Sequence, residues 1–583
     1  AWLLGQGRGE KLALSDGSTM KLSGEGTTSL YNLAGDWNLT ASSYSYPDLI
    51  AKPLARPNTL SFQGTFGEQE FRLSSLNCNL APLSLFATAT SRYQGAVSLE
   101  VKTNQFQVAE IAPLFPAARK YQPAGKIQAQ LRGAGAGLDR LDWGGSVALS
   151  GVSFKAWEKI KPVTAVNGSI RISGEELESS QFSARLGSST INGRGTLSGF
   201  KSPSLAVSFS SPSLDLADLG LDPGPAPVHA EKVQGTLSYS KDNLQISSLS
   251  GTLGKSVLQI KGSVQNLQRP LIELSVNSPH LELEDITRIF SGSSTGGPPF
   301  TMKANLVATE GRAHGIAFQK FRSVVMLEDK ILYLQPFDFS SMGGQVSGRM
   351  RVDFGSGAPR YQVNCNMQQI SAERLMRSLG VKKQEMTGKL SLQGELSAKG
   401  ESAAEFRKTA LGAVKLKVEQ GSIRKFSTLS KIFSILNVSQ LFKFQLPDMV
   451  SGGMPYNKIS GDFAIRDGIA STQNLFLDGD AINLSAVGKL DLVRNQLDLN
   501  IGVQPLQTVD KVVNRIPIVG WILTGKDRSF ITTYFEAKGP IEDPQVTAVP
   551  VKSLAKGVLN IFKRVFQLPG RLVTDTGEVM IGN

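Results

Sequence analysis

The stretch GSVQNLQRPLIELSVNSPHLELED, residues 262–285, decides the fold, and GTLSGFKSPSLAVSFSSPSLDLAD, residues 195–218, is its counterpart. Each begins with glycine, runs through two alternating segments joined by a polar turn, and ends at a Ser-Pro turn and an acidic residue. Successive side chains of a strand point to opposite faces, so the alternation predicts strands with one apolar and one polar face. A polar face of Ser, Asn, Thr and Gln suits water, which favours an antiparallel sheet.

The unit recurs along the chain. Looser copies occupy residues 348–373 and 488–510, and an early copy begins at Gly95. Glycines also recur just before four of the units. Glycine permits the positive φ of a tight turn, so these positions predict hairpins. The hairpin glycines are Gly187, Gly254, Gly343, Gly344 and Gly479.

We therefore expect a mostly β chain: a long, repetitive, curled antiparallel sheet that forms a U-shaped groove. A sandwich is the ordinary alternative for such strands. Single cores stop growing near ~250–300 residues, so 583 residues of repeats favour a solenoid-like array. Helices are expected to be few, the clearest at residues 427–444, 508–523 and 552–566.

Two loops rich in Pro, Gly or Ser, at residues 222–227 and 291–299, are typical of linkers or insertions. The expected organisation is three β-groove segments followed by a C-terminal region with amphipathic helices. The groove segments are residues 1–150, 151–295 and 296–420, and the C-terminal region is residues 421–583.

The charge and the chemistry-bearing residues narrow the functional classes. The net charge of +13 favours an anionic partner, yet zinc-finger spacing, an RNA-binding aromatic signature and long Lys/Arg runs are all missing from the sequence. We therefore expect no nucleic acid; the charge suits an anionic membrane surface, or is mild basicity dispersed over the surface without a dedicated partner. Cys78 and Cys365 sit in alternating segments among apolar residues and are interpreted as small buried hydrophobes.

No pattern indicates catalysis. The three histidines, His229, His280 and His314, have no partner at metal-ligand spacing. Acidic residues recur at one repeat position and allow two interpretations: carboxylates for acid–base work, or caps on the N-terminal N–H groups of short helices. The second is favoured, and the sequence predicts no enzyme, no metal and no cofactor. The acidic residues are Asp218, Asp285, Glu373 and Asp510.

The apolar face is the informative feature. Apolar surface in water costs ~25 cal/mol per Å², and a soluble protein seldom leaves a large patch uncovered. Acyl chains are the simplest partner, because they are flexible and indifferent to side-chain detail, while their headgroups would stay in water. The expected lipid contacts are Leu205, Val207, Phe209, Ile272, Leu274, Val276, Tyr361, Val363, Ile482, Leu484, Leu497, Leu499 and Ile501.

The C-terminal helices have two interpretations. Residues 552–566 are basic and amphipathic, a pattern that suits an anionic membrane interface or a helix that caps the edge of the last strand and buries its apolar face there, and both can hold together. Residues 516–523 are equally ambiguous and too short to cross a membrane, which needs ~18 apolar residues. The expected membrane contacts are Ile518, Trp521, Ile522, Phe562 and Phe566.

Several segments near the C-terminus resemble the bacterial AsmA-like family. They are residues 433–442 (FSILNVSQLF), 453–456 (GMPY), 477–484 (LDGDAINL), 525–527 (GKD) and 534–540 (YFEAKGP). The resemblance covers roughly residues 410–570, is looser from about residue 140, and is only general before that.

This resemblance implies a U-shaped β-groove related to TamB and to chorein-type bridge-like lipid transfer proteins. It also implies a periplasmic location, an N-terminal inner-membrane anchor, and phospholipid movement toward the outer membrane. The chain begins abruptly at AWLL, so we expect that an export signal or anchor has been removed.

The leading hypothesis is therefore a bridge that carries phospholipids between the inner and outer membranes, with a membrane or a membrane protein at either end. The alternative is a scaffold for the assembly of outer-membrane proteins that holds its clients at exposed strand edges.

Overall fold

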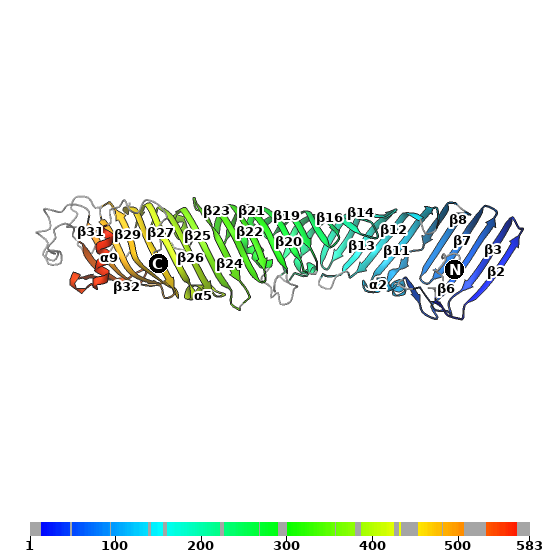
Figure 1. Cartoon of the computed structure of the whole chain (residues 1–583), viewed down its shortest axis with the longest axis horizontal. Helices are drawn as coiled ribbons and strands as arrows, with labels where there is room; N and C mark the ends of the chain where they lie inside the picture. Colours follow the sequence, from blue (N-terminus) through cyan, green and yellow to red (C-terminus); the bar gives the residue numbers. More distant parts are fainter. Residues whose placement is uncertain are drawn as a thin grey trace, which may run out of the picture. The chain divides into compact units, whose positions relative to one another are not determined.

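The computed structural model describes residues 13–46, 49–93, 95–137, 141–155, 160–221, 227–267, 269–289, 300–355, 357–378, 386–424, 431–432, 453–480, 482–505 and 532–567. The chain divides into two compact units, Ala1–Pro298 and Pro299–Asn583, which we call unit 1 and unit 2. The expectation of a mostly β chain with extended antiparallel pairing and few short helices is confirmed (Figure 1).

Unit 1 is built almost entirely from antiparallel strands, each hydrogen-bonded to its neighbour in the sequence. The main ladder continues across two interruptions, because β3 pairs with β6 and β9 pairs with β11. Its strands are β2 (Thr19–Gly26), β3 (Leu30–Asn38), β6 (Asn58–Gly67), β7 (Glu70–Leu80), β8 (Leu83–Arg92), β9 (Val97–Thr103), β10 (Phe106–Gln107), β11 (Ala124–Gly135), β12 (Leu141–Phe154), β13 (Val163–Ser173), β14 (Glu176–Leu186), β15 (Ser189–Ser198), β16 (Ser204–Asp215), β17 (His229–Ser240), β18 (Asn243–Leu253), β19 (Ser256–Gln265) and β20 (Leu271–Glu282).

Short strands and helical turns lie along the rims of this sheet. A separate small sheet forms from β1 (Ala13–Leu14), β4 (Tyr44–Tyr46) and β5 (Ile50–Lys52). The helical turns are α1 (Val108–Ile111), η3 (Ala112–Leu114), α2 (Pro116–Arg119), η4 (Leu216–Leu219) and α3 (Leu283–Ile289). The turns η4 and α3 directly follow β16 and β20, so both quoted sequence stretches end in a helical turn, as their acidic residues predict.

Unit 2 repeats the architecture of antiparallel strands. They are β21 (Thr301–Ala313), β22 (Ile316–Glu328), β23 (Ile331–Ser341), β24 (Gly344–Asp353), β25 (Arg360–Ser371), β26 (Lys389–Lys399), β27 (Leu411–Ile423), β28 (Met454–Arg466), β29 (Ile469–Gly479), β30 (Ile482–Asp491), β31 (Gln496–Pro505), β32 (Thr533–Pro540) and β33 (Gln545–Val549). Its helices are α4 (Ala372–Ser378), α5 (Ala403–Thr409), η6 (Val551–Ser553) and α9 (Lys556–Gln567).

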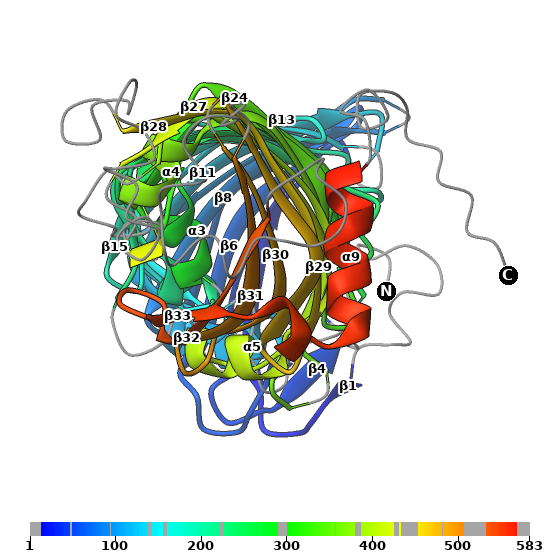
Figure 2. The same cartoon turned by 90° about the vertical axis from the view of Figure 1, so that its left-hand side faces the viewer.

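The strands of unit 2 are curved, and α9 lies outside that curve beside β29 (Figure 2). The expected helix at residues 552–566 is found as η6 followed by α9. The helix expected at residues 508–523 lies outside the described residues, as does the one at 427–444 apart from residues 431–432. None of the helices in the described ranges is long and apolar enough to cross a membrane.

A buried core cluster of unit 2 runs from β24 to β32, with most of its members toward the C-terminal end. Val418, Tyr456, Val503 and Phe535 belong to one cluster and are all at most 3% exposed. Ile432 is fully buried in the same cluster, and the neighbouring Lys431 holds the β32–β33 turn through an ion pair with Asp543 (2.6 Å). This end of unit 2 is therefore packed like the interior of an ordinary domain.

Candidate functional site: an apolar sheet face

The predicted lipid contacts of the two quoted stretches come together on one face of unit 1. Val207 on β16 and Leu274 on β20 belong to a single row of directly opposed residues that crosses the sheet. Directly opposed side chains lie on the same face with Cβ atoms about 4.5–5.5 Å apart. We call this the central row: Gly195, Val207, Leu237, Ile246, Gly262 and Leu274.

Two further rows flank the central row on the same face. Leu205 and Ile272 end a row that runs through Tyr239, Leu244 and Val264. Phe209 and Val276 end a second row that runs through Gly235, Leu249 and Ile260. The six lipid contacts predicted in this region therefore form one continuous apolar surface across β16–β20.

The side chains of this surface stay accessible although neighbouring strands flank them on both sides. Val207, Phe209 and Leu274 are half-buried, and Leu205 is 39% exposed. Within the described part of unit 1, the strands pair with their neighbours in a ladder, and no second sheet is hydrogen-bonded or packed across β16–β20. The sandwich alternative is therefore not what this region forms.

The opposite face of the same strands is polar. Ser208 alternates with Val207 and faces Thr236, with the two hydroxyl oxygens 3.3 Å apart. Ser275 alternates with Leu274 and lies opposite Lys261. An apolar ligand therefore has one face of the sheet to bind, and it is the face that carries the central row.

In unit 2 the predicted contacts fall into an accessible group and a buried group. Tyr361 and Val363 on β25 are half-buried and lie opposite Val352 and Met350 of β24. The Tyr361 ring also meets Phe406 of α5 edge-on, with 5.8 Å between the centroids. These two residues occupy a face like that of unit 1.

The second group belongs to the packed core described above. Its members are between 4% and 9% exposed and pack with Phe535 and Val418. They therefore hold the end of unit 2 together and present little surface to a ligand. They are Ile482, Leu484, Leu497, Leu499 and Ile501.

The amphipathic helix α9 packs on the other face of this end. Phe562 is fully buried against Val487 and Tyr534, and Phe566 stacks on Phe562 with 6.5 Å between the ring centroids. Val487 and Tyr534 alternate with the core residues Ala486 and Phe535, so α9 lies on the face opposite the core.

The close approach of α9 depends on a glycine. A Cβ at Gly502 would stand 3.1 Å from a ring atom of Phe566 and 3.2 Å from one of Phe562, so the two rings fill the place of a side chain. The helix therefore buries its apolar side against the sheet, as one interpretation predicts, but it does so on a face of β30–β32 and not at the edge of the last strand, and Phe562 presents no exposed surface. The basic side chains of Lys556, Lys563 and Arg564 point away from the sheet and are exposed. The other expected membrane contacts, Ile518, Trp521 and Ile522, lie outside the described residues.

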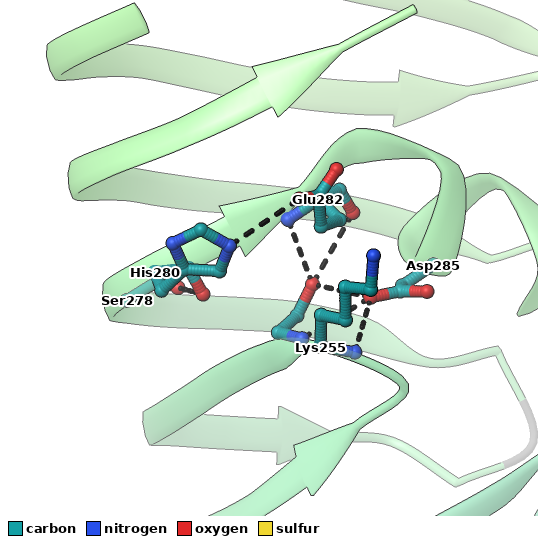
Figure 3. Close-up of polar contacts among 6 residues, drawn as sticks. Lys255, Ser278, His280, Glu282 and Asp285 are labelled. Atoms are coloured by element: carbon teal, nitrogen blue, oxygen red, sulfur yellow. Dashed lines mark hydrogen bonds and ion pairs between the residues drawn. The ribbon is translucent and has the colours of Figure 1, made fainter. Parts of the chain in front are cut away.

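A carboxylate locks each glycine hairpin of unit 1 to the rim. Asp285 accepts hydrogen bonds from the backbone N–H groups of Lys255 (2.9 Å) and Ser256 (3.1 Å) and from the Ser256 hydroxyl (2.9 Å) (Figure 3). The same hydroxyl accepts a bond from the Glu282 N–H at 2.9 Å. Gly254 has φ +58°, and a Cβ there would stand 2.3 Å from the carboxylate, so only glycine fits.

The lock is repeated one unit earlier in the sequence. Asp218 accepts bonds from the backbone and hydroxyl groups of Ser188 and Ser189 at 2.8–3.1 Å, beside Gly187. Asp218 and Asp285 lie in the first turns of η4 and α3, as expected, but the bonds given above take their carboxylates to a hairpin about 30 residues earlier. The N-cap of η4 is Asp215 and not Asp218, and the Asp215 carboxylate accepts from the Ala217 N–H at 3.0 Å.

The other two acidic positions behave differently. Glu373 lies in the first turn of α4 and pairs with Arg377 at 3.3 Å on the surface. Asp510 lies outside the described residues. Sequence repetition marks all four residues alike, because the partners of Asp218 and Asp285 stand about 30 positions away in the chain and are not visible as a local pattern.

The described ranges hold no group of three His, Cys, Asp or Glu side chains placed to bind a metal ion. His280 approaches Glu282 on the same strand, with 3.3 Å between Nε2 and Oε1 (Figure 3). Cys78 and Cys365 are free thiols on the apolar faces of their units, and burial raises the pKa of both. Their positions among apolar residues agree with the interpretation as small hydrophobes, although both are half-buried and not buried.

No curated protein matches this chain. Residues 313–546 match the family model described as YhdP protein, and the whole of the matched range lies within unit 2.

Proposed function

We propose that this chain is a non-enzymatic lipid carrier that holds phospholipid acyl chains against its apolar sheet face. The carrying observation is the accessible surface of the central row and its two flanking rows, which crosses β16–β20. Burying such a surface under a hydrocarbon chain is favourable by ~25 cal/mol per Å². Acyl chains need no polar partner, which agrees with a face on which the hydroxyl group of Tyr239 is the one polar side-chain group in the three described rows.

The family match supports a more specific proposal. The YhdP model covers residues 313–546, and the C-terminal segments resemble the AsmA-like lipid transfer proteins. We therefore place the chain in the periplasm, where it would move phospholipids between the inner and outer membranes. The exposed basic side chains of α9 would favour contact with an anionic membrane surface or a membrane-protein partner at that end.

The experiment compares charged substitutions on the two faces of the same strands. Val207→Asp and Leu274→Asp place a carboxylate in the central row, whereas Ser208→Asp and Ser275→Asp place the same charge on the polar face one residue away. We expect the first pair to lose most co-purifying phospholipid in native mass spectrometry and to slow transfer of a fluorescent phospholipid between vesicles at least tenfold. The second pair should behave like the unmodified protein.

Equal lipid content and transfer in all four variants would contradict the proposal. Capture of client proteins along a strand edge, without bound phospholipid, would favour the assembly-scaffold alternative instead.

A further inference from the structure

A basic pocket lies at the rim of unit 1, where the small sheet meets η3 and α2. Its volume is about 780 Å³, within the ~300–1,000 Å³ typical of small-molecule sites. Three cationic side chains line it: Lys52, Arg56 and Arg119. Among the described residues that line it, none is acidic.

Lys52 is the most deeply placed of the three cations. It is only 2% exposed, and its Nζ donates to the carbonyl oxygens of Thr40 (3.4 Å), Ser42 (2.6 Å) and Pro53 (3.1 Å). Carbonyl oxygens satisfy hydrogen bonds but bring no opposite charge. Burial, and then the nearby Arg56, lower the pKa of Lys52, as expected for an ammonium group held without a counter-ion.

The two arginines have hydrogen-bonding capacity left over. Arg56 donates through Nη2 to the carbonyl oxygens of Ala81 (2.9 Å) and Glu110 (2.7 Å), and its Nε is buried with no acceptor in the described structure. Arg119 donates through Nε to the Pro113 carbonyl oxygen at 2.9 Å. A guanidinium group carries five N–H donors in a fork that matches the oxygens of a phosphate.

The rest of the wall mixes apolar side chains with the hydroxyl groups of three serines and a tyrosine, and its apolar part stands next to the sheet face. Leu114 lines the pocket and also packs in a buried cluster with Leu80 and Phe106. Leu80 ends the run Leu76–Cys78–Leu80 on the apolar side of β7. A ligand with its charge in the pocket could therefore lay an attached chain on the apolar face of unit 1.

We propose that this pocket binds the phosphate group of an anionic lipid. The lipid part of this proposal rests on the proposed function, whereas the binding of phosphate to the three cations stands apart from it. Lys52 would supply a desolvated positive charge, and Arg56 and Arg119 would hold the phosphate oxygens. The pocket would thus admit anionic lipids at the rim, although the sheet face itself makes no distinction between headgroups.

The test uses the full chain and three soluble probes in isothermal titration calorimetry: short-chain phosphatidic acid, inorganic phosphate, and short-chain diacylglycerol. We expect phosphatidic acid to bind most tightly and diacylglycerol to bind weakest. Arg119→Gln and Arg56→Gln should each weaken phosphatidic acid binding about 10- to 150-fold, since a hydrogen bond to a charged group contributes ~1.5–3 kcal/mol. Lys120→Gln removes the same charge from the neighbouring exposed residue and should change nothing.

Arg56 also bonds two carbonyl oxygens, so its variant could fail to fold; Arg119→Gln then carries the test, with circular dichroism confirming its fold. Unchanged affinity in Arg119→Gln, or equal binding of diacylglycerol, would overturn the pocket. Equal affinity for inorganic phosphate would overturn the lipid assignment and leave a soluble phosphate as the ligand. Val207→Asp should retain binding in the pocket, so failure of the carrier proposal and failure of the pocket give different results.

Discussion

At the scale of single residues, Asp285 is the clearest case of a side chain that fixes the sheet. Its carboxylate is shared by a hairpin and a rim helix that are about 30 residues apart, so it sets where the β18–β19 turn stands against α3. Hydrogen bonds to a charged acceptor are stronger than neutral ones, and a buried donor left without an acceptor costs ~1–3 kcal/mol.

We therefore expect Asp285→Ala to lower the free energy of unfolding by about 2–4 kcal/mol, because it leaves two backbone N–H groups unpaired. Hydrogen exchange measured by mass spectrometry should show faster exchange at Lys255 and Ser256. Glu373→Ala is the matched control, since the exposed Glu373–Arg377 pair should contribute less than about 1 kcal/mol. Exchange at the hairpin that is no faster in Asp285→Ala than in the control would contradict the lock.

At the scale of elements, α9 shows why an amphipathic sequence pattern does not predict which surface the helix packs against. The helix buries Phe562 on the outer face of β30–β32 while its lysines stay in water. A membrane interface and a sheet would both be suitable partners for the same apolar stripe. The docked position depends on the missing side chain of Gly502, which lies on a strand about 60 residues earlier in the chain.

Gly502→Val should displace α9, because a branched side chain cannot share the space of the two phenyl rings. Overpacking of this kind typically costs ~1–3 kcal/mol. We expect faster hydrogen exchange and earlier proteolysis within residues 556–567. Lys563→Gln, on the exposed side of the helix, should show neither effect, and an unchanged α9 in Gly502→Val would refute this packing.

What sequence alone could reveal follows from the range of each interaction. Alternation is local, so the apolar face, the alignment of Val207 with Leu274 and the start of the rim helices were all predictable. The partners of Asp218 and Asp285, the docking of α9 and the cluster around Lys52 depend on residues brought together by the sheet. The burial of Leu497 and Ile501 could not be predicted either, because strands with covered and with accessible apolar faces have the same alternating sequence pattern.

At the scale of the whole molecule, the two units carry one native thiol each on the apolar face. Cys78 lies between Leu60 and Leu85, and Cys365 lies between Gly348 and Gly394. Because burial raises the pKa of each thiol, less of the reactive thiolate is present at neutral pH than for a free cysteine. These positions report on the occupancy of each unit without any engineered change.

If lipid covers the apolar face of unit 1 and that of unit 2, both cysteines should react slowly with N-ethylmaleimide in the lipid-bound protein and several-fold faster after delipidation. The rates should still rise with pH above neutrality, as the thiolate fraction grows. Peptide mass spectrometry separates the two sites, and the denatured protein gives the unprotected rate. Protection of Cys78 or Cys365 alone would limit the carrier surface to one unit.

The repeated hairpin lock bears on how such a chain changes length during evolution. Gly187 and Gly254 are separated by the same number of residues as Asp218 and Asp285, and β14–β16 correspond to β18–β20. The interval from Gly187 to Gly254 holds four strands, β15–β18, which is an even number. A tandem duplication of this segment therefore ends at the same rim of the sheet at which it begins, with the chain running in the same direction. Such a copy contains its own aspartate and hairpin glycine, and it adds about 19 Å of sheet at ~4.8 Å per strand. Every apolar side chain of the copy stays on the apolar face.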